Sequence, residues 1–83
     1  MYKLLIIPSA KKDLDKLPKK NFTQIKDKIL LLGENPRPRG VLKLTSDEGY
    51  RMRSGNYRIL YRIDDKRRVI YLYRIKHRRE VYR

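Results

Sequence analysis

The chain has 83 residues, no cysteine, one histidine and a formal net charge of +14 at pH 7, which suits one small domain over residues 1–83 and excludes disulfides and thiolate metal sites. Its N-terminal apolar run is too short for a signal peptide, and no stretch approaches the roughly 20 apolar residues of a membrane span, so we expect a soluble cytoplasmic protein. The excess of Lys and Arg predicts a polyanionic partner, which on charge alone could be RNA, DNA, an anionic membrane or a very acidic protein.

The chain opens with a pattern that predicts a strand and then a helix. Residues 2–7 form an apolar run that Pro8 stops, which is typical of a buried strand. Ser9 is a suitable N-cap for a first helix, and Pro18 ends it. The apolar stripe of this helix follows helical spacing and consists of Ala10, Leu14 and Leu17.

A second helix follows at once. Asn21 and Gln24 resemble a capping box at its start, and Gly33 is the expected C-cap. Its apolar positions are Phe22, Ile25, Ile29 and Leu32. Two helices joined by so few residues form a helical hairpin, whose apolar side must lie on the one flat partner available, a sheet.

The second half of the chain predicts that sheet. Residues 34–40 carry two prolines and a glycine and form a rigid connector, and residues 45–49 form a polar loop. Between and after them we expect strands at 41–44, 50–53, 57–63 and 69–75, with turns at 54–56 and 64–67. The predicted fold is α+β: an N-terminal strand, a helical hairpin, then a three- to four-stranded antiparallel sheet with both helices on one face.

Arginine is concentrated on one face of the predicted sheet. Arg51 and Arg53 alternate with Met52 and share a face, and Arg58 and Arg62 do the same in the next strand. The tight turn at 54–56 brings the first three of these arginines together. Like charges placed opposite each other destabilise a sheet, so their crowding indicates a site for an anion.

The sequence has few groups for other kinds of chemistry. Asp64 and Asp65 are the only adjacent carboxylates of the sheet region, and their place in a turn favours turn formation over a magnesium site. Glycine-rich phosphate loops and nucleophile motifs are absent from the sequence. RNA cleavage by the substrate's own 2′-hydroxyl needs only orientation, charge stabilisation and proton transfer, and a cationic, aromatic site can supply these.

Three stretches resemble the RelE branch of the RelE/ParE toxins of bacterial and archaeal toxin–antitoxin pairs. They are residues 42–44 (LKL), 50–61 (YRMRSGNYRILY) and 75–82 (IKHRREVY). The resemblance implies a helical hairpin on a twisted antiparallel sheet, the RelE-like microbial RNase fold. It also implies ribosome-dependent cleavage of mRNA, neutralisation by a cognate acidic antitoxin, and no metal or small-molecule cofactor.

The resemblance also assigns residues. Arg51 and Arg53 match the basic residues at the scissile phosphate, although relatives often carry lysine there and arginine does not readily give up its proton. Arg58 matches an arginine that stabilises the phosphorane, and Tyr82 matches a tail aromatic that stacks on a base.

The basic residue of the tail is ambiguous between Lys76, His77 and Arg78. We favour His77 for proton transfer, because its ordinary pKa near 6.5 suits both giving and taking a proton. Other cations are expected to bind RNA, namely Lys43, Arg62, Lys76, Arg78 and Arg79.

Simpler interpretations stay open. Arg51 and Arg53 could be phosphate anchors, His77 could be a turn residue, and the strand tyrosines could be core or cross-strand pairs. At the level of function, the alternatives are a ParE-like toxin that inhibits DNA gyrase and a basic nucleic-acid-binding module without chemistry.

Overall fold

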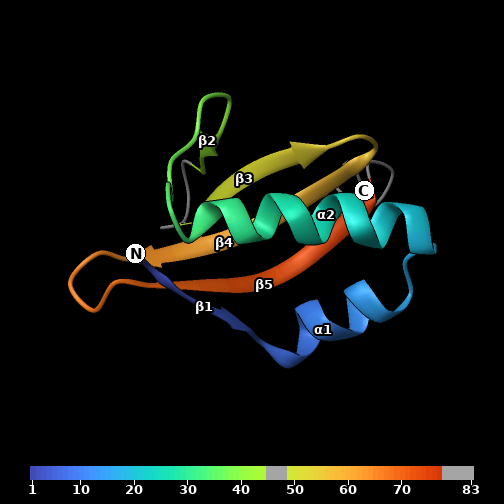
Figure 1. Ribbon diagram of the computed structural model, residues 1–83, viewed down its shortest axis with the longest axis horizontal. Helices are drawn as coiled ribbons and strands as arrows, with labels where there is room; N and C mark the ends of the chain where they lie inside the picture. Colours follow the sequence, from blue (N-terminus) through green and yellow to red (C-terminus); the bar gives the residue numbers. More distant parts are fainter. Residues whose placement is uncertain (45–48, 78–83) are drawn as a thin grey trace.

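The computed structural model describes residues 1–44 and 49–77. Along the chain it contains β1 (Lys3–Ile6), α1 (Pro8–Asp15), α2 (Lys19–Leu32), β2 (Leu42–Lys43), β3 (Gly49–Ser54), β4 (Tyr57–Asp64) and β5 (Val69–His77). The predicted α+β order is confirmed (Figure 1). No helix in the described ranges is long and apolar enough to cross a membrane.

The five strands form one sheet in the order β1-β5-β4-β3-β2. Strands β2 to β5 are antiparallel neighbours, as predicted, whereas β1 pairs in parallel with β5, with Leu4 opposite Ile70. The expectation of a buried first strand is wrong. Strand β1 lies at the sheet edge and three of its four residues are exposed, because it packs on the core through Leu4 alone.

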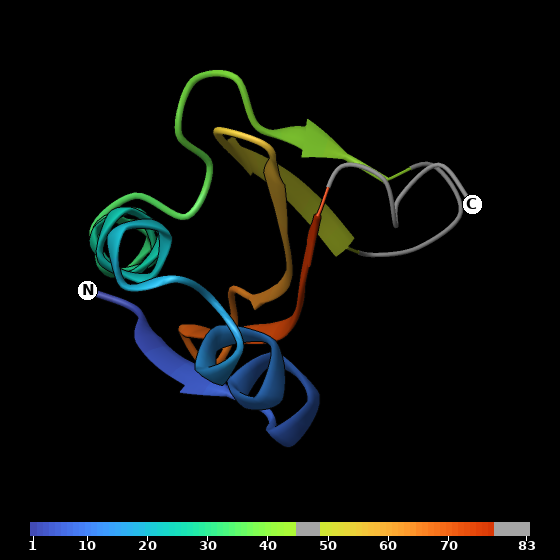
Figure 2. The ribbon, with the colours of Figure 1, turned by 90° about the vertical axis from the view of Figure 1, so that its right-hand side faces the viewer.

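Both helices lie on the same side of the twisted sheet (Figure 2). The core is formed by buried side chains of the helices and of the sheet face that they cover. The helices contribute Ala10 and Leu14 from α1 and Ile25, Ile29 and Leu32 from α2, which are the predicted stripes. The sheet contributes Ile59, Tyr61, Ile70, Leu72 and Ile75. The helices therefore cover one face of the sheet, and within residues 1–44 and 49–77 no helix lies on the opposite face, here called the open face.

The helix ends differ from the predictions. Helix α1 begins at Pro8 with Ile7 as N-cap, because proline is well suited to the first helical position. Helix α2 begins at Lys19 after Pro18, so residues 21 and 24 lie inside the helix and form no capping box. Gly33 is the C-cap, as predicted, with a right-handed φ of −60°.

Beyond the end of β1, side chains of helix α1 make hydrogen bonds to the outer edge of β5. The backbone N–H of Ile7 makes the last bond of this edge to the carbonyl of Leu72, 3.1 Å away. Beyond it, the Ser9 hydroxyl donates to the carbonyl of Tyr73 at 2.7 Å, and the Asp13 carboxylate accepts from the N–H of Ile75 at 2.8 Å. Ser9, predicted as a helix cap, instead holds the helix on the sheet.

A register shift divides β5 into two parts. Leu60 lies opposite Arg74 but Tyr61 lies opposite Leu72, so β5 has one extra residue, Tyr73, at this point. Such a bulge reverses which residues face the core. Ile70 and Leu72 are buried before it and Ile75 after it, so the side chain of the next residue, Lys76, is on the open face.

Candidate functional site

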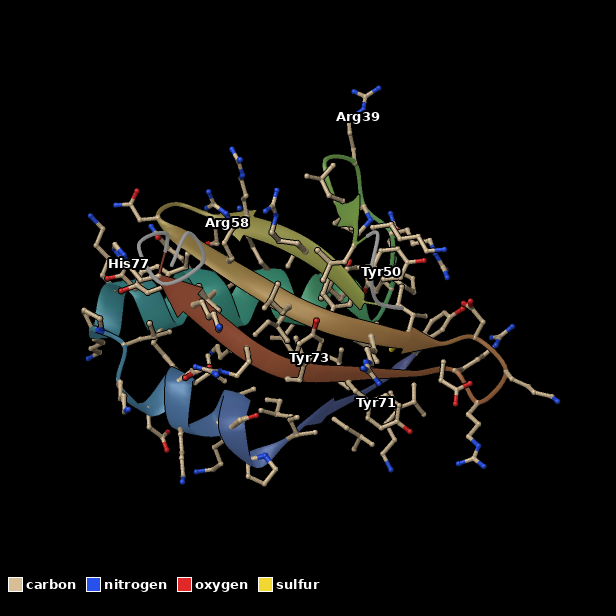
Figure 3. The ribbon with its side chains drawn as sticks, turned by 180° about the vertical axis from the view of Figure 1, so that it is seen from behind. Arg39, Tyr50, Arg58, Tyr71, Tyr73 and His77 are labelled. Atoms are coloured by element: carbon tan, nitrogen blue, oxygen red, sulfur yellow. The ribbon has the colours of Figure 1, made fainter. Side chains whose placement is uncertain are left out.

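The open face carries the arginines of β3 and β4. Tyr50 and Met52 pack on the core from β3, and Ile59 and Tyr61 are buried in it from β4. The alternating residues of the two strands therefore point the other way, as predicted. Those residues include Arg51, Arg53, Arg58 and Arg62, and Figure 3 shows the molecule from this side, with Arg58 labelled.

Three cations of the open face stand directly opposite one another across three strands. Arg53 of β3 pairs with Arg58 of β4, and Arg58 pairs with Lys76 of β5. We call Arg53, Arg58 and Lys76 the cationic row. Neighbouring strands lie about 4.8 Å apart, so these positive charges repel one another unless an anion lies among them.

Burial makes this arrangement more costly. Arg58 is only 3% exposed, and among the described residues the Nε atoms of Arg58 and Arg51 are buried with no hydrogen-bond partner. Buried charges in proteins are nearly always paired, because an unpaired charge away from water costs several kcal/mol. Two guanidinium groups with buried N–H donors, next to further cations, are suited to the oxygens of a phosphodiester.

Lys76 and His77 point to opposite faces of β5. Lys76 lies beside Arg58 in the cationic row, whereas His77 pairs with Tyr57. The two rings meet edge to face, with centroids 5.2 Å apart and planes at 89°. Because Tyr57 packs on the core, His77 lies toward the helix side of the sheet. The structure thus brings Lys76, and not His77, next to the arginines.

The remaining predicted residues lie at various distances from the row. Lys43 pairs with Tyr50 and so shares the helix-side face of the sheet edge. Arg62 is on the open face near the turn between β4 and β5, with its guanidinium 5.9 Å from the centroid of the Tyr73 ring. Three predicted tail residues, Arg78, Arg79 and Tyr82, lie outside the described residues.

Tyr71 and Tyr73 lie on the open face, which the sequence did not predict. Tyr71 lies opposite Arg62, and Tyr73 follows two residues later, so both rings are on the open face before the register shift (Figure 3). The other strand tyrosines, Tyr50, Tyr57 and Tyr61, pack on the core, which is one of the two expectations for strand tyrosines. The buried apolar positions 70, 72 and 75 carry the signal of the shift, because their spacing changes from two to three.

The chemistry of the site is that of a polyanion binder with a buried charge. The described residues contain no group of three His, Asp or Glu side chains that could hold a metal ion. The row can bind a phosphate diester and stabilise extra negative charge on it, and Lys76 adds an ammonium group as a proton donor.

Comparisons with known proteins relate this chain to toxins of type II toxin–antitoxin systems. A family model described as the ParE toxin of the parDE type II toxin–antitoxin system matches residues 4–82. The chain is 31% identical over 84 aligned positions to the toxin RelG of Mycobacterium tuberculosis, covering 99% of this chain and 97% of RelG.

Solved structures show the same fold. The RelE–RelB complex of the archaeon Pyrococcus horikoshii contains a chain that is similar with a TM-score of 0.83 and 31% identity, covering 93% of this chain and 94% of that one. The isolated Escherichia coli RelE toxin gives a TM-score of 0.82 and 28% identity, covering 99% and 92%. The chain therefore belongs to the RelE/ParE superfamily of type II toxin–antitoxin toxins, and within it to the RelE-like branch.

Proposed function

We propose that this toxin is a ribosome-dependent mRNA endonuclease that needs no metal ion and that inhibits translation. The observation that carries the proposal is the cationic row with its buried Arg58. In the proposed reaction the RNA 2′-oxygen attacks the adjacent phosphorus and the bond to the 5′-oxygen breaks. The products are a 2′,3′-cyclic phosphate and a 5′-hydroxyl, so one proton passes from the 2′-hydroxyl to solvent water and one is added to the 5′-oxygen.

Different residues of the site are proposed to bind the phosphate, stabilise its charge, donate a proton and orient a base. Arg51 and Arg53 bind the phosphate, and Arg58 stabilises the charge that builds up on its oxygens in the transition state. Lys76 lies beside Arg58, and we propose that its ammonium group donates a proton to the leaving 5′-oxygen. Tyr82 is proposed to stack on a base and hold its orientation.

The ribosome has a defined role in this proposal. The open face can attract and neutralise a phosphodiester, but it offers little to hold flexible single-stranded RNA in the in-line geometry that the attack requires. An mRNA held in the ribosome already has part of that constraint. Purified toxin alone should therefore cut RNA poorly, and efficient cleavage of naked RNA by a contaminant-free preparation would contradict ribosome dependence.

We also propose that an acidic antitoxin neutralises the chain, as the Pyrococcus relative was solved in complex with RelB. The net charge of +14 favours fast, charge-steered association with an acidic partner. Leu30 and Leu31, 57% and 62% exposed at the end of α2, offer an apolar contact. Leu31 also lines a pocket of about 430 Å³ that carries Lys28, Arg39 and Arg53. Apolar contacts with cations around them suit an acidic amphipathic segment.

Arg58→Ala is the decisive test of catalysis. It should slow single-turnover mRNA cleavage on programmed ribosomes by about 10²–10³-fold, because one transition-state donor is lost. Ribosome affinity should change much less, because many cations still contact the polyanion. Arg67→Ala, an exposed cation in the turn between β4 and β5, is the matched control and should change neither quantity. If Arg58→Ala weakens affinity as much as it slows cleavage, the row is an anchoring patch.

Gyrase inhibition is the second candidate, because the matching family model is described as a ParE toxin. Induced expression in bacteria with labelled precursors separates the candidates. Arrest of protein synthesis with shortened mRNAs supports the endonuclease, and arrest of DNA synthesis supports gyrase inhibition. Unchanged growth would favour a binding module without chemistry.

A further inference from the structure

Beyond the Arg53 end of the cationic row, a pocket opens at the outer edge of β3. It lies between that strand, helix α2 and the connector and has a volume of about 430 Å³, within the range of about 300–1,000 Å³ of small-ligand sites. Strand β2 pairs with Tyr50 and Arg51, so in the described part of the chain it does not cover Met52 and Arg53, which line the pocket. We call this cavity the edge pocket.

The charged side chains of the edge pocket are all positive in the described part of its lining. They belong to Lys28, Arg39 and Arg53, and each of these residues is exposed. Arg53 is also the member of the cationic row on the β3 side. The Lys28 ammonium donates to the backbone carbonyl of Arg53 at 3.1 Å, which uses one of its three N–H donors. The positive charge of the row therefore continues past the sheet edge onto helix α2.

The other side chains of the described lining are apolar. They are Leu31 of α2, Pro38 of the connector and Met52 of β3. Met52 packs on the core, whereas Leu31 is 62% exposed. Figure 3 shows Arg39 extending outward from the connector, which puts its charge at the rim of the pocket. Apolar walls beside positive charges suit a ligand in which a flat apolar group is joined to a phosphate, as in a nucleotide.

We propose that the edge pocket binds an RNA nucleotide next to the phosphate held in the cationic row. Its base packs on the three apolar side chains, and its phosphate pairs with Lys28 and Arg53. This inference rests on the proposed function, which places the substrate phosphate in the row. RNA enters the pocket while the toxin is free of antitoxin, since an acidic antitoxin segment at Leu31 would occupy the same space.

Two neighbouring leucines of α2 test the base contact. The ligands are a labelled ten-nucleotide 2′-O-methyl RNA, which has no 2′-hydroxyl and cannot be cut, and the same backbone without bases. Leu31→Ala should weaken binding of the intact oligonucleotide to the full chain by about three- to tenfold, because apolar contact with the base is lost. It should not change binding of the abasic one. Leu30→Ala, at a 57% exposed position outside the described lining, is the matched control and should change neither affinity.

Lys28→Gln tests the phosphate contact. It should weaken binding of both oligonucleotides equally and reduce the slope of log affinity against log salt concentration by about one, because one phosphate contact is lost. Lys26→Gln, at an exposed position of the same helix outside the described lining, should leave that slope unchanged.

Equal effects of Leu31→Ala on the intact and the abasic oligonucleotide would overturn the inference, as would equal effects of the two leucine variants. Unchanged RNA binding by Leu31→Ala and Lys28→Gln would also overturn it and leave the pocket to the antitoxin alone. These experiments measure binding and no cleavage. The edge pocket can therefore fail while Arg58→Ala still slows cleavage on the ribosome, and the endonuclease proposal can fail while base-dependent binding is observed.

Discussion

Arg58 combines burial with like-charged neighbours on both sides. It is 3% exposed and lies between Arg53 and Lys76. Each of these features destabilises a positive charge, and a fold without an anionic ligand gains nothing from their combination. An anion that binds there replaces repulsion by attraction in a site that is already shielded from water. The donors are already in place when charge develops on the phosphate, which is the requirement for electrostatic catalysis.

The opposite orientations of Lys76 and His77 give a prediction at a single residue. Lys76→Ala should slow single-turnover cleavage by about 10²–10⁴-fold if the ammonium group donates the proton. Lys76→Arg keeps the charge but is a poor proton donor, so it should restore RNA binding without restoring the rate. His77→Ala should reduce the rate less than Lys76→Ala.

The pH dependence of cleavage decides between the two residues. If His77→Ala loses as much rate as Lys76→Ala and also changes the shape of the pH profile, then His77 transfers the proton, as the sequence suggested. In that case the His77 side chain would have to move from Tyr57 toward the arginines when the toxin binds the ribosome.

At the level of elements, helix α1 covers the part of the β5 edge that β1 does not reach. Strand β5 has β1 beside it only as far as Leu72, and an uncovered edge invites pairing with other chains. Beyond Leu72, Ser9 of the helix donates to the carbonyl of Tyr73, and Asp13 accepts from the N–H of Ile75. Asp13 also accepts a hydrogen bond from the Arg74 Nε at 2.9 Å. One helix therefore covers the core and closes the edge of the strand that carries Lys76.

The Asp13 contact should contribute measurably to stability. Its side chain is 15% exposed, and Asp13→Ala would leave the N–H of Ile75 without its acceptor. We expect the free energy of unfolding to fall by about 1–3 kcal/mol. Asp15→Ala is a matched control, since Asp15 makes an exposed 3.5 Å ion pair with Lys11, and should cost less than about 1 kcal/mol. Urea denaturation followed by circular dichroism measures both variants, and equal losses would show that Asp13 does not hold the helix to the sheet.

The sequence predicted most of the sheet because local alternation determines which residues share a face. It identified the arginines of β3 and β4 in this way, together with a tight turn at 54–56, which in the structure connects Ser54 to Tyr57 with Gly55 at a φ of +59°. It did not predict the parallel pairing of β1, since nothing local specifies a partner as far along the chain as Val69 is from Lys3. The register shift in β5 depends on packing against the whole core. The choice between Lys76 and His77 depends on that shift, so the sequence alone did not predict which of the two lies beside Arg58.

At the scale of the whole molecule, one network ties distant segments together. Arg37 of the connector donates to both carboxylate oxygens of Asp65 in the turn between β4 and β5, and its Nε donates to the hydroxyl of Tyr50 at 3.2 Å. Tyr2 at the N-terminus donates to the same carboxylate. The Tyr61 hydroxyl, whose pKa is raised by burial, donates to the carbonyl of Pro36 at 2.8 Å. The connector is thereby held on the sheet through Pro36 and Arg37, and the partners of Arg37 are 13 and 28 residues away in the sequence.

The network should make part of the stability depend on pH. The hydrogen bonds from Arg37 and then Tyr2 lower the pKa of Asp65 from 3.8 to about 2 in the folded chain. Because the folded pKa is below the unfolded one, the contribution is complete above about pH 5 and is lost as the pH falls from about 4 to 2. Asp65→Asn should therefore lower the urea midpoint at pH 7 and have little effect at pH 2. Asp27→Asn, at an exposed position of α2, should show no such difference between the two pH values. If Asp65→Asn destabilises the chain equally at pH 7 and pH 2, its effect comes from lost shape or neutral hydrogen bonds, and the ionic clamp is not what holds the connector on the sheet.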